Sequence, residues 1–485
     1  MNKIFELDPK QVWKHFYSLT QIPRPSKKEA KIIEFMKNFG ENLGLETIVD
    51  EIGNVIIRKP ATKGMENRQG VILQAHLDMV PQKNSDKVHD FEKDPIQAYV
   101  DGEWVTADGT TLGADNGMGV AAAMAVLESN DIEHGLVEAL FTIDEETGMT
   151  GAENLQPNVL QGDILLNLDS EDEGELYIGC AGGVDVNVEM EYPETEAPEG
   201  FAAFEISLVG LKGGHSGMDI NLGRGNSNKL LARFLSHCFY NFDMKLASFD
   251  GGSLRNAIPR EAFAKVMVPN ADADKLVKEV ELFNDIFRAE FEKTEPDMNL
   301  SIEQTDAPKT IIADNFKDLM VKAVFASHHG VVRMSDSMPG LVETSNNLAI
   351  VKMIDGKFEV NSLVRSSVDS AKIGTMHKIG TIFELIGADV KFEGSYPGWK
   401  PNTDSPILKT MQSVYENMHG RIPEIKAIHA GLECGILGAI YPNWDMISFG
   451  PTIRYPHSPD EKVHIASVGK FWDYLVETLK NVPEK

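Results

Sequence analysis

The sequence predicts an α/β protein in which a first domain, built on a central, mostly parallel sheet flanked by helices, is interrupted by an inserted α+β domain. Apolar, strand-like runs alternate with helical stretches in the first third of the chain, as they do in α/β domains. Histidine and carboxylate side chains follow several of these runs, and a further histidine, His457, lies near the C-terminus. The C-terminal segment is therefore predicted to close the first domain, and the region before it to be an insertion.

The composition narrows the functional classes. A chain of 485 residues with 42% hydrophobic and 25% charged residues is long enough for two globular domains. Its net charge of −28 argues against a nucleic acid or a membrane as partner. Three widely spaced cysteines favour a reducing compartment over a disulfide framework. No signal-peptide core and no run of about 18 apolar residues is present, so a cytoplasmic protein is predicted.

The first elements are predicted to be two helices between residues 9 and 43, separated at the Pro-containing stretch 22–26. Ser26 is placed to cap the second helix. Two short strands are expected next, at residues 46–49 and 54–58.

The run Val71–Met79, VILQAHLDM, is predicted to be a strand that ends in His76 and Asp78. Side chains alternate along a strand, so these two residues point to the same side. A carboxylate beside an imidazole, where a buried strand reaches the surface, suits a metal ligand and the partner that orients it. Taken alone, a His-x-Asp sequence is more often a structural pair.

Further side chains of metal-ligand type occupy similar places. Glu145 and Glu146 follow the run EALFTID, Asp169 follows DILLNL, and His457 lies in a Pro-rich loop after the run MISF. Asp115 stands at the entrance of an Ala-rich helical stretch. Because ligands gather beyond the carboxyl ends of the strands in open α/β sheets, these residues and the histidine of the first strand are predicted to form one metal site.

Each of these residues has an ordinary alternative role. Glu145 and Glu146 fit a solvated strand end, Asp115 fits a turn, and His457 fits a loop. Neither turn chemistry nor surface chemistry explains why every one of them adjoins an apolar strand or a helix start. We therefore favour the metal site.

The character of the sequence changes after the stretch GCAGG at residues 179–183. Strand, helix and strand appear twice beyond it, without a fixed repeat period. The predicted domains are residues 1–183 with 397–485, and an insertion of residues 184–396. The elements predicted in the insertion are strands at 184–191 and 204–209, a helix at about 228–238, a hairpin of strands 348–354 and 358–366 around Asp355-Gly356, a helix at about 373–386 and a strand at 388–392.

Six short motifs stand at or near these positions: HLDMV, GADNG, EETG, LDSE, GGHSG and YPHSPDE. Together they resemble the zinc-dependent aminoacylase/carboxypeptidase superfamily of metallopeptidases. The likeness to the dipeptidases of this superfamily covers essentially the whole chain, through RKPATKGMENR, VHDFEKDPIQAYVDGEW, LRNAIPREAFA and HAGLECG. One such stretch is a weak signal, whereas all of them together are a strong one.

The resemblance implies a catalytic domain that holds two Zn²⁺ ions, for which Mn²⁺ or Co²⁺ can substitute. Each ion then has two ligands of its own, a shared carboxylate and a shared water, which suits the preference of zinc for about four N and O ligands. The implied ligands are His76 and Asp169 for one ion, Glu146 and His457 for the other, and Asp115 as the bridge.

Two further features of the metal site are implied. Asp78 would orient the imidazole of His76, and the peptide bond between Asp115 and Asn116 would be cis.

The implied reaction is the hydrolysis of unblocked dipeptides, including Xaa-His substrates of the carnosine type. A water between the two zinc ions attacks the scissile carbonyl, and Glu145 acts as the general base. An N-acyl-amino-acid deacylase or a tripeptidase with the same two metals is the alternative. A metal-binding scaffold without catalysis would lack the base, and Glu145 is present.

The inserted domain is implied to be a lid that contacts the substrate. His215 would stabilise the oxyanion, within its own subunit or across a dimer, although its glycines equally fit a plain turn. Asn256 and Arg365 would bind substrate, with Arg365 on the terminal carboxylate, and a surface salt bridge is the alternative for Arg365. Gly431 and Glu433 would line the pocket for the amino end.

The remaining histidines and cysteines near these motifs are given structural roles. His429 and Cys434 are predicted to be structural, and His464 to start a helix. Small peptides are the implied substrates, and a homodimer formed through the lid is the implied assembly.

Overall fold

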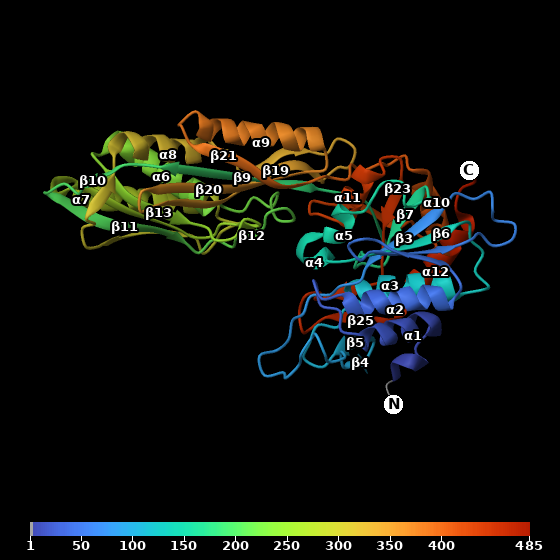
Figure 1. The fold of residues 1–485 in the computed structure, drawn as a ribbon. Helices are drawn as coiled ribbons and strands as arrows, with labels where there is room; N and C mark the ends of the chain where they lie inside the picture. The colour runs from blue at the N-terminus through green and yellow to red at the C-terminus, as the bar shows by residue number, and fades with distance from the viewer. Residues whose placement is uncertain (1–2) are drawn as a thin grey trace. The chain divides into compact units, whose positions relative to one another are not determined.

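A computed structural model describes residues 3–485 and separates the chain into two compact units (Figure 1). The first unit comprises the chain up to Gly179 together with Pro401–Ala427 and Leu432–Lys485, and the second comprises Cys180–Lys400 and Ile428–Gly431. The short segment Ile428–Gly431 joins the second unit because the backbone N–H of Ala181 donates to the carbonyl groups of Ile428 and Ala430. None of the helices in the described part of the chain is both long and apolar enough to cross a bilayer.

The first unit contains a mixed sheet with helices on its faces, together with a small sheet. Its helices are η1 (Lys3–Glu6), α1 (Lys10–Thr20), α2 (Ala30–Asn42), α3 (Ala114–Glu128), α4 (Glu145–Gly148), α5 (Thr150–Glu153), α10 (Pro406–His419), α11 (Glu433–Ile440) and α12 (Ile465–Asn481). Its strands are β1 (Glu46–Val49), β2 (Val55–Lys59), β3 (Val71–His76), β4 (Ala98–Asp101), β5 (Trp104–Ala107), β6 (Val137–Thr142), β7 (Ile164–Asn167), β8 (Glu175–Cys180), β22 (Glu424–Ile428), β23 (Asp445–Ser448), β24 (Ile453–Arg454) and β25 (Lys462–His464).

The large sheet of the first unit has the strand order β1-β2-β6-β3-β7-β23-β8-β22. Its centre is parallel, since β3 pairs parallel with β6 and β7, and β7 pairs parallel with β23. Antiparallel pairs flank this centre, between β1, β2 and β6 on one side and between β23 and β8 on the other. The predicted α/β class is therefore confirmed. The carboxyl ends of the parallel strands meet at one edge, which places the residues that follow them side by side.

Helix α3 lies in the interior of the first unit, packed against β3 and α1. Small residues allow this close approach. A Cβ atom on Gly119 would lie 2.6 Å from the carbonyl oxygen of Leu168, so a larger residue would push the helix away from the loop after β7.

One local prediction for the first unit is wrong. Ser26 does not cap α2, which begins after Glu29 without a side-chain cap, because the Ser26 hydroxyl donates to Asp78 Oδ2 instead. The stretch around Asp101-Gly102 forms the hairpin β4–β5, which pairs with β25 in the small sheet.

The second unit consists of antiparallel sheets and helices. Its helices are α6 (Ser227–Asn241), η2 (Asn270–Asp272), α7 (Ala273–Glu290), α8 (Asp314–Ala326) and α9 (Asp369–Glu384). Its strands are β9 (Gly182–Glu191), β10 (Glu194–Glu196), β11 (Phe201–Val209), β12 (Gly214–His215), β13 (Lys245–Gly251), β14 (Ala257–Ile258), β15 (Ala262–Pro269), β16 (Asn299–Gln304), β17 (Thr310–Ile312), β18 (Gly330–Met334), β19 (Val342–Ile354), β20 (Lys357–Ser366) and β21 (Asp389–Tyr396).

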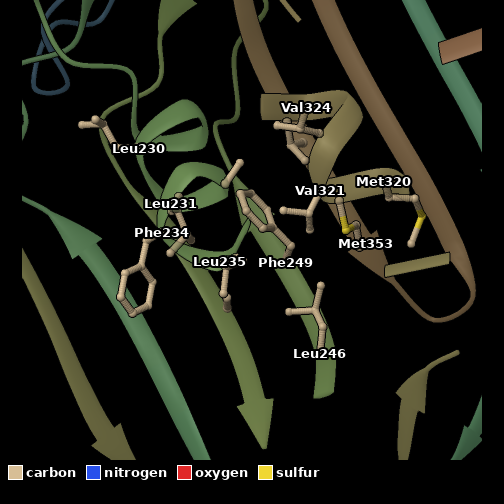
Figure 2. Close-up of a cluster of buried hydrophobic side chains, with 14 of the residues drawn as sticks. Leu230, Leu231, Phe234, Leu235, Leu246, Phe249, Met320, Val321, Val324 and Met353 are labelled. Atoms are coloured by element: carbon tan, nitrogen blue, oxygen red, sulfur yellow. The ribbon is translucent and has the colours of Figure 1, made fainter. Parts of the chain in front are cut away.

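The main sheet of the second unit has the order β16-β11-β15-β13-β19-β20-β9-β21, with β18 paired to β19. One apolar cluster joins this sheet to its helices. Leu235 of α6 and Val321 of α8 lie against Phe249 of β13 in this cluster (Figure 2). The alternation of buried and partly exposed residues along β9, β11 and β15 fits a sheet with one covered face.

The hairpin predicted around Asp355-Gly356 is confirmed as β19–β20. Both turn residues have positive φ, as a two-residue hairpin loop requires. Helices α7 and α8 were not predicted from the sequence.

Candidate metal centre

The centre begins at the end of β3, where His76 is buried with 1% of its surface exposed. Its Nδ1 lies 3.3 Å from Asp78 Oδ1, and its Nε2 lies 3.2 Å from Asp115 Oδ1 and 3.5 Å from Asp169 Oδ1. One nitrogen of the ring therefore faces an orienting carboxylate, while the other faces two carboxylates that come from different parts of the chain.

Asp115 lies between two imidazoles at the start of α3. Its Oδ1 faces His76, and its Oδ2 lies 3.2 Å from Nε2 of His457. The peptide bond between Asp115 and Asn116 is cis, as the resemblance implies. The Asn116 side chain donates to the carbonyl oxygen of Leu168, which holds the start of α3 against the loop that carries Asp169.

Glu145 and Glu146 begin α4, directly after Asp144 in the left-handed conformation at φ 52°. Asp78 Oδ1 accepts the backbone N–H of Glu145 at 3.0 Å, and its Oδ2 accepts that of Glu146 at 3.2 Å. These two bonds start a helical turn. Consecutive side chains on a helix still diverge, by about 100°. Glu146 Oε2 consequently lies 3.0 Å from His457 Nε2.

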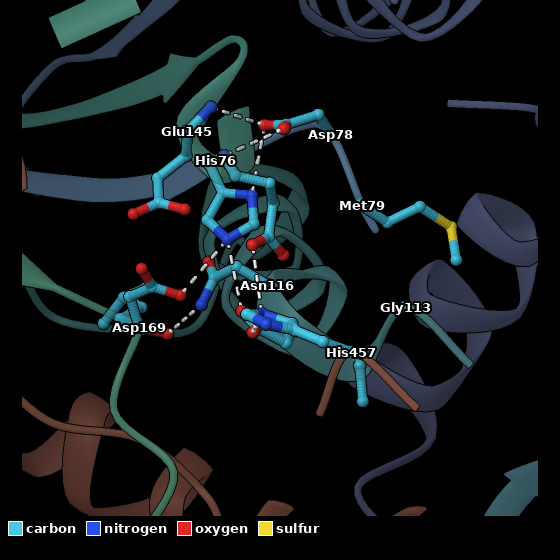
Figure 3. A network of polar contacts seen from close by, with 12 residues as sticks. His76, Asp78, Met79, Gly113, Asn116, Glu145, Asp169 and His457 are labelled. Carbon is cyan, nitrogen blue, oxygen red and sulfur yellow. Dashed lines mark hydrogen bonds and ion pairs between the residues drawn. The ribbon is translucent and has the colours of Figure 1, made fainter. Parts of the chain in front are cut away.

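The structure brings the predicted ligand residues into two groups that share Asp115. His76, Asp115 and Asp169 form one group, and Asp115, Glu146 and His457 form the other. Within each group, one ligand atom from every residue lies within 4.8 Å of the others. Figure 3 shows the two imidazole rings and the carboxylates of Glu145 and Asp169 gathered around this region.

Burial and crowded charges shift the pKa values of these residues. The pKa of Asp169 rises to about 7, because the side chain is buried and Asp115 and Glu146 add negative charge nearby. Burial also raises the pKa of Glu145 well above its ordinary value. Contacts with the carboxylates of Asp115 and Glu146 raise the pKa of His457 to about 11. In the metal-free chain, protons thus offset charge that bound cations would otherwise balance.

Two buried oxygen atoms test whether a metal fits. Glu146 Oε1 and Asp169 Oδ1 have no hydrogen-bond partner within the described part of the chain. Buried polar atoms are normally hydrogen-bonded, so an exception calls for a specific explanation such as an ion. Both atoms belong to carboxylates of the two groups, and a donor set of imidazole and carboxylate suits Zn²⁺ or Mn²⁺.

Glu433 lies close to the centre, on α11. It is buried, and its Oε2 accepts from Gln74 Nε2 at 2.6 Å and from the Thr142 hydroxyl at 2.9 Å. Burial raises its pKa to about 8. Gly431, predicted together with it, belongs to the second unit.

The other predicted substrate contacts lie in the second unit. His215 is half-buried in β12, and its Nδ1 accepts the backbone N–H groups of Gly217 and Met218 at 3.2 and 3.0 Å. Burial and the charge of Arg365 lower its pKa. The ring is therefore neutral and carries its proton on Nε2, so Nε2 can donate a hydrogen bond. Asn256 is exposed next to β14, and its carbonyl oxygen accepts the backbone N–H of Ser216.

Arg365 is buried within β20, with 5% of its surface exposed. Its Nε donates to the Ser216 hydroxyl at 3.2 Å and its Nη1 to the Tyr396 hydroxyl at 3.1 Å. Among the described residues it forms no ion pair with a carboxylate, so the alternative of a surface salt bridge is wrong. His429 is buried, and its Nε2 forms a hydrogen bond of 2.8 Å with the Ser345 hydroxyl. This contact fits the structural role expected for His429.

Sequence reasoning missed two buried charged residues that contact the centre. Arg24 donates to carbonyl groups after β3, and Glu461 accepts from backbone N–H groups before α3. Both stand in Pro-containing loops, where a charged residue ordinarily indicates solvent exposure. Nothing in their spacing signals burial.

Comparison with known proteins agrees with this geometry. The family described as peptidase family M20/M25/M40 matches residues 72–481. The chain is 47% identical over 485 residues to the cytosol non-specific dipeptidase of Escherichia coli (strain K12), with all of both chains covered. The structure of an aminoacylhistidine dipeptidase from Vibrio alginolyticus matches with a TM-score of 0.96 and 48% identity, covering 99% of this chain and 98% of that one. Aminopeptidase PepT from Bacillus cereus shares the fold at a TM-score of 0.56 and 17% identity, covering 98% of this chain and 99% of that one.

Proposed function

The chain belongs to peptidase family M20/M25/M40, and we propose that it is a metal-dependent dipeptidase that hydrolyses unblocked dipeptides, including those with C-terminal histidine. The full-length likeness to a cytosol non-specific dipeptidase and to an aminoacylhistidine dipeptidase supports this substrate class. The cytosolic location in the name of the Escherichia coli relative also supports a cytoplasmic protein.

The observation that carries the proposal is the convergence of two groups of ligand-type side chains on Asp115. We propose that His76 and Asp169 hold one Zn²⁺ ion and that Glu146 and His457 hold a second. When bound, such ions lower the pKa of water and polarise a carbonyl group. Mn²⁺ or Co²⁺ can take the same places, because the ligands are imidazole and carboxylate.

Glu145 is proposed as the general base. Its carboxylate lies within the cluster but contributes to neither of the two groups that share Asp115. It accepts a proton from the attacking water and passes it to the amine nitrogen of the leaving residue. Asp78 holds the backbone N–H groups of Glu145 and Glu146 and therefore fixes the direction of both side chains.

The second unit is proposed to act as a lid that binds the ends of the substrate. His215, with a proton on Nε2, donates to the oxyanion, in its own subunit or across a homodimer formed through this unit. Arg365 binds the terminal carboxylate, which its lack of a carboxylate partner among the described residues supports. Asn256 adds a polar contact to the substrate, while Gly431 and Glu433 receive its amino end.

A hydrolysis panel tests the proposal. Free dipeptides, tripeptides and N-acetylated amino acids are incubated with the protein after chelator treatment, with and without added Zn²⁺. We expect rapid cleavage of free dipeptides, including β-alanyl-histidine, only when metal is restored. A preference for N-acetylated amino acids or for tripeptides would instead indicate the deacylase or the tripeptidase, and full activity in chelator would contradict a metal-dependent enzyme.

A further inference from the structure

Two buried charged side chains, Arg24 and Glu461, connect the segments that carry the proposed metal ligands. Each has 2% of its surface exposed. Neither forms an ion pair within 4.0 Å among the described residues, although both contact the loop before α3. Burying a charge without an ionic partner is costly unless hydrogen bonds satisfy it, so the groups that they contact explain their presence.

Glu461 accepts hydrogen bonds from four consecutive backbone N–H groups. Its Oε2 accepts from Leu112 and Gly113 at 2.7 and 2.9 Å. Its Oε1 accepts from Ala114 and Asp115 at 2.7 and 3.2 Å. The carboxylate therefore holds the backbone from which the Asp115 side chain reaches between the two imidazoles.

Arg24 holds the same loop from the other side. Its Nη2 donates to the carbonyl oxygen of Gly113 at 2.5 Å, and its Nη1 donates to those of Leu77 and Asp78, both at 2.8 Å. Gly113 is thus bound through its N–H by Glu461 and through its carbonyl by Arg24. It adopts φ 71°, and a Cβ atom there would lie 2.6 Å from Arg24 Nη2, so the contact requires glycine.

The segments joined in this way are the ones that bear ligands. Leu77 and Asp78 directly follow His76, and Glu461 belongs to the loop that carries His457. Two side chains therefore connect three ligand-bearing segments that are distant in the sequence.

We propose that Arg24 and Glu461 are positioning residues that set the spacing of His76, Asp115 and His457, and hence the affinity of the centre for its two metal ions. This role rests on the proposed metallopeptidase function. Neither residue touches a metal or a substrate in this role, because each acts through the backbone of the ligand-bearing segments.

Metal affinity measured separately from stability tests the proposal. In Glu461→Gln the side-chain amide nitrogen replaces an acceptor oxygen, so two backbone N–H groups lose their partner. In Arg24→Lys the charge remains, but the planar fork that reaches three carbonyl groups is lost. Glu138→Gln is the matched control, since Glu138 is also buried in the first unit and its Oε2 accepts backbone N–H groups from Gln161 and Gly162 at 2.7 and 2.8 Å.

Co²⁺ affinity is measured for each protein by competition with a chelator, together with the visible absorption of bound Co²⁺ and the thermal unfolding temperature. We expect Glu461→Gln and Arg24→Lys to lose about 10- to 100-fold in Co²⁺ affinity and to change the absorption spectrum. Glu138→Gln should lose stability while keeping the wild-type affinity and spectrum. Should Glu461→Gln fail to fold, Arg24→Lys decides the outcome by itself.

If Glu461→Gln and Arg24→Lys lose only thermal stability, as the control does, and bind Co²⁺ like the wild type, the positioning role is overturned. The proposed function would remain intact in that case. A wild-type protein that binds no Co²⁺ would overturn the metallopeptidase function, and the positioning role with it.

Discussion

The carboxylates of Glu145 and Glu146 leave the first turn of α4 in different directions, and this divergence separates their proposed tasks. Glu146 meets His457, whereas Glu145 lies near His76 and is raised in pKa by burial. The raised pKa belongs to the metal-free chain, and the positive charge of bound cations would lower it and leave the Glu145 carboxylate able to accept a proton.

Replacing Glu145 by Gln should lower kcat by about 100- to 10,000-fold, because the amide cannot accept the proton. Metal content measured by atomic spectroscopy should stay at the wild-type level. Glu153→Gln, an exposed residue of α5, is the control and should retain full activity. Wild-type turnover in Glu145→Gln would rule out the proposed base.

Metal binding should release protons. At pH 7 the metal-free His457 is protonated, since its pKa is raised to about 11, and His76 is likewise raised well above its ordinary pKa. An imidazole binds metal only through an unprotonated nitrogen, so the proton must leave. Apparent affinity should therefore increase with pH, by up to about tenfold per pH unit for each proton released. Calorimetric titration with Zn²⁺ in buffers of different ionisation enthalpy measures the release, and heats independent of the buffer would contradict it.

Sequence reasoning reached His76, Asp115, Glu146 and Asp169 because each ends or directly follows an apolar strand or begins a helix. It reached His457 because this histidine lies in the loop that comes after the apolar run MISF. It did not reach Arg24 and Glu461, because a charged residue in a Pro-containing loop has the same appearance in a sequence whether it is buried or exposed. The prediction that Ser26 caps the second helix was wrong for a related reason. The hydroxyl had a competing acceptor, Asp78, that only the folded chain brings near.

At the scale of elements, α3 determines how closely the loop carrying Asp115 can approach β3. The helix is apolar all round and buried, so glycine and alanine set its distance from its neighbours. The hairpin at Asp355-Gly356 was predictable because its turn residues are specific. Helix α7 was missed although its buried residues Leu276, Val280, Phe283 and Phe287 recur at helical spacing, whereas the buried face of α8 includes the charged Lys317.

Gly119→Ala should lower the free energy of unfolding by about 1–3 kcal/mol, because the added methyl group meets the Leu168 carbonyl. Gly374→Ala is the matched control within α9, where an added Cβ meets nothing within 4 Å. That variant should be stabilised by about 0.5–1 kcal/mol through the higher helix propensity of alanine. Urea unfolding measures both, and equal effects of the same sign would contradict the close packing of α3.

At the scale of the whole molecule, the chain completes its first unit only after it has traversed the second. His457 returns to a centre whose other ligand-type residues precede Cys180. The recurrence of ligand chemistry near the C-terminus made this discontinuity predictable. The assignment of Ile428–Gly431 to the second unit was not predictable, because it depends on backbone hydrogen bonds to Ala181 that no side-chain pattern encodes.

Stability should fall in acid partly through His329 of the second unit. Its Nδ1 lies 3.1 Å from Asn226 Nδ2 and 3.4 Å from the backbone nitrogen of Leu348, both donors. Burial and the charge of Lys229 lower its pKa to about 3. Below about pH 6.5 the unfolded chain binds a proton at His329 that the folded chain does not bind. The stabilisation is therefore present above pH 6.5 and is lost as the pH falls toward 3.

The loss amounts to at most about 1.4 kcal/mol per pH unit for this one group. His329→Gln keeps an acceptor but does not titrate, and the free energy of unfolding should then depend less steeply on pH between 6.5 and 4. Urea unfolding at several pH values compares the two proteins. Identical slopes would show that His329 is not protonated on unfolding.

The most direct test of the central claim is the number of metal ions bound per chain, measured by titrating the metal-free protein with Co²⁺. We expect two equivalents for the wild type, weak binding of both in Asp115→Ala because the shared ligand is lost, and one tight equivalent in Asp169→Ala because only one group is broken. If Asp115→Ala still binds two equivalents as tightly as the wild type, the two groups do not form one shared centre and the account is wrong.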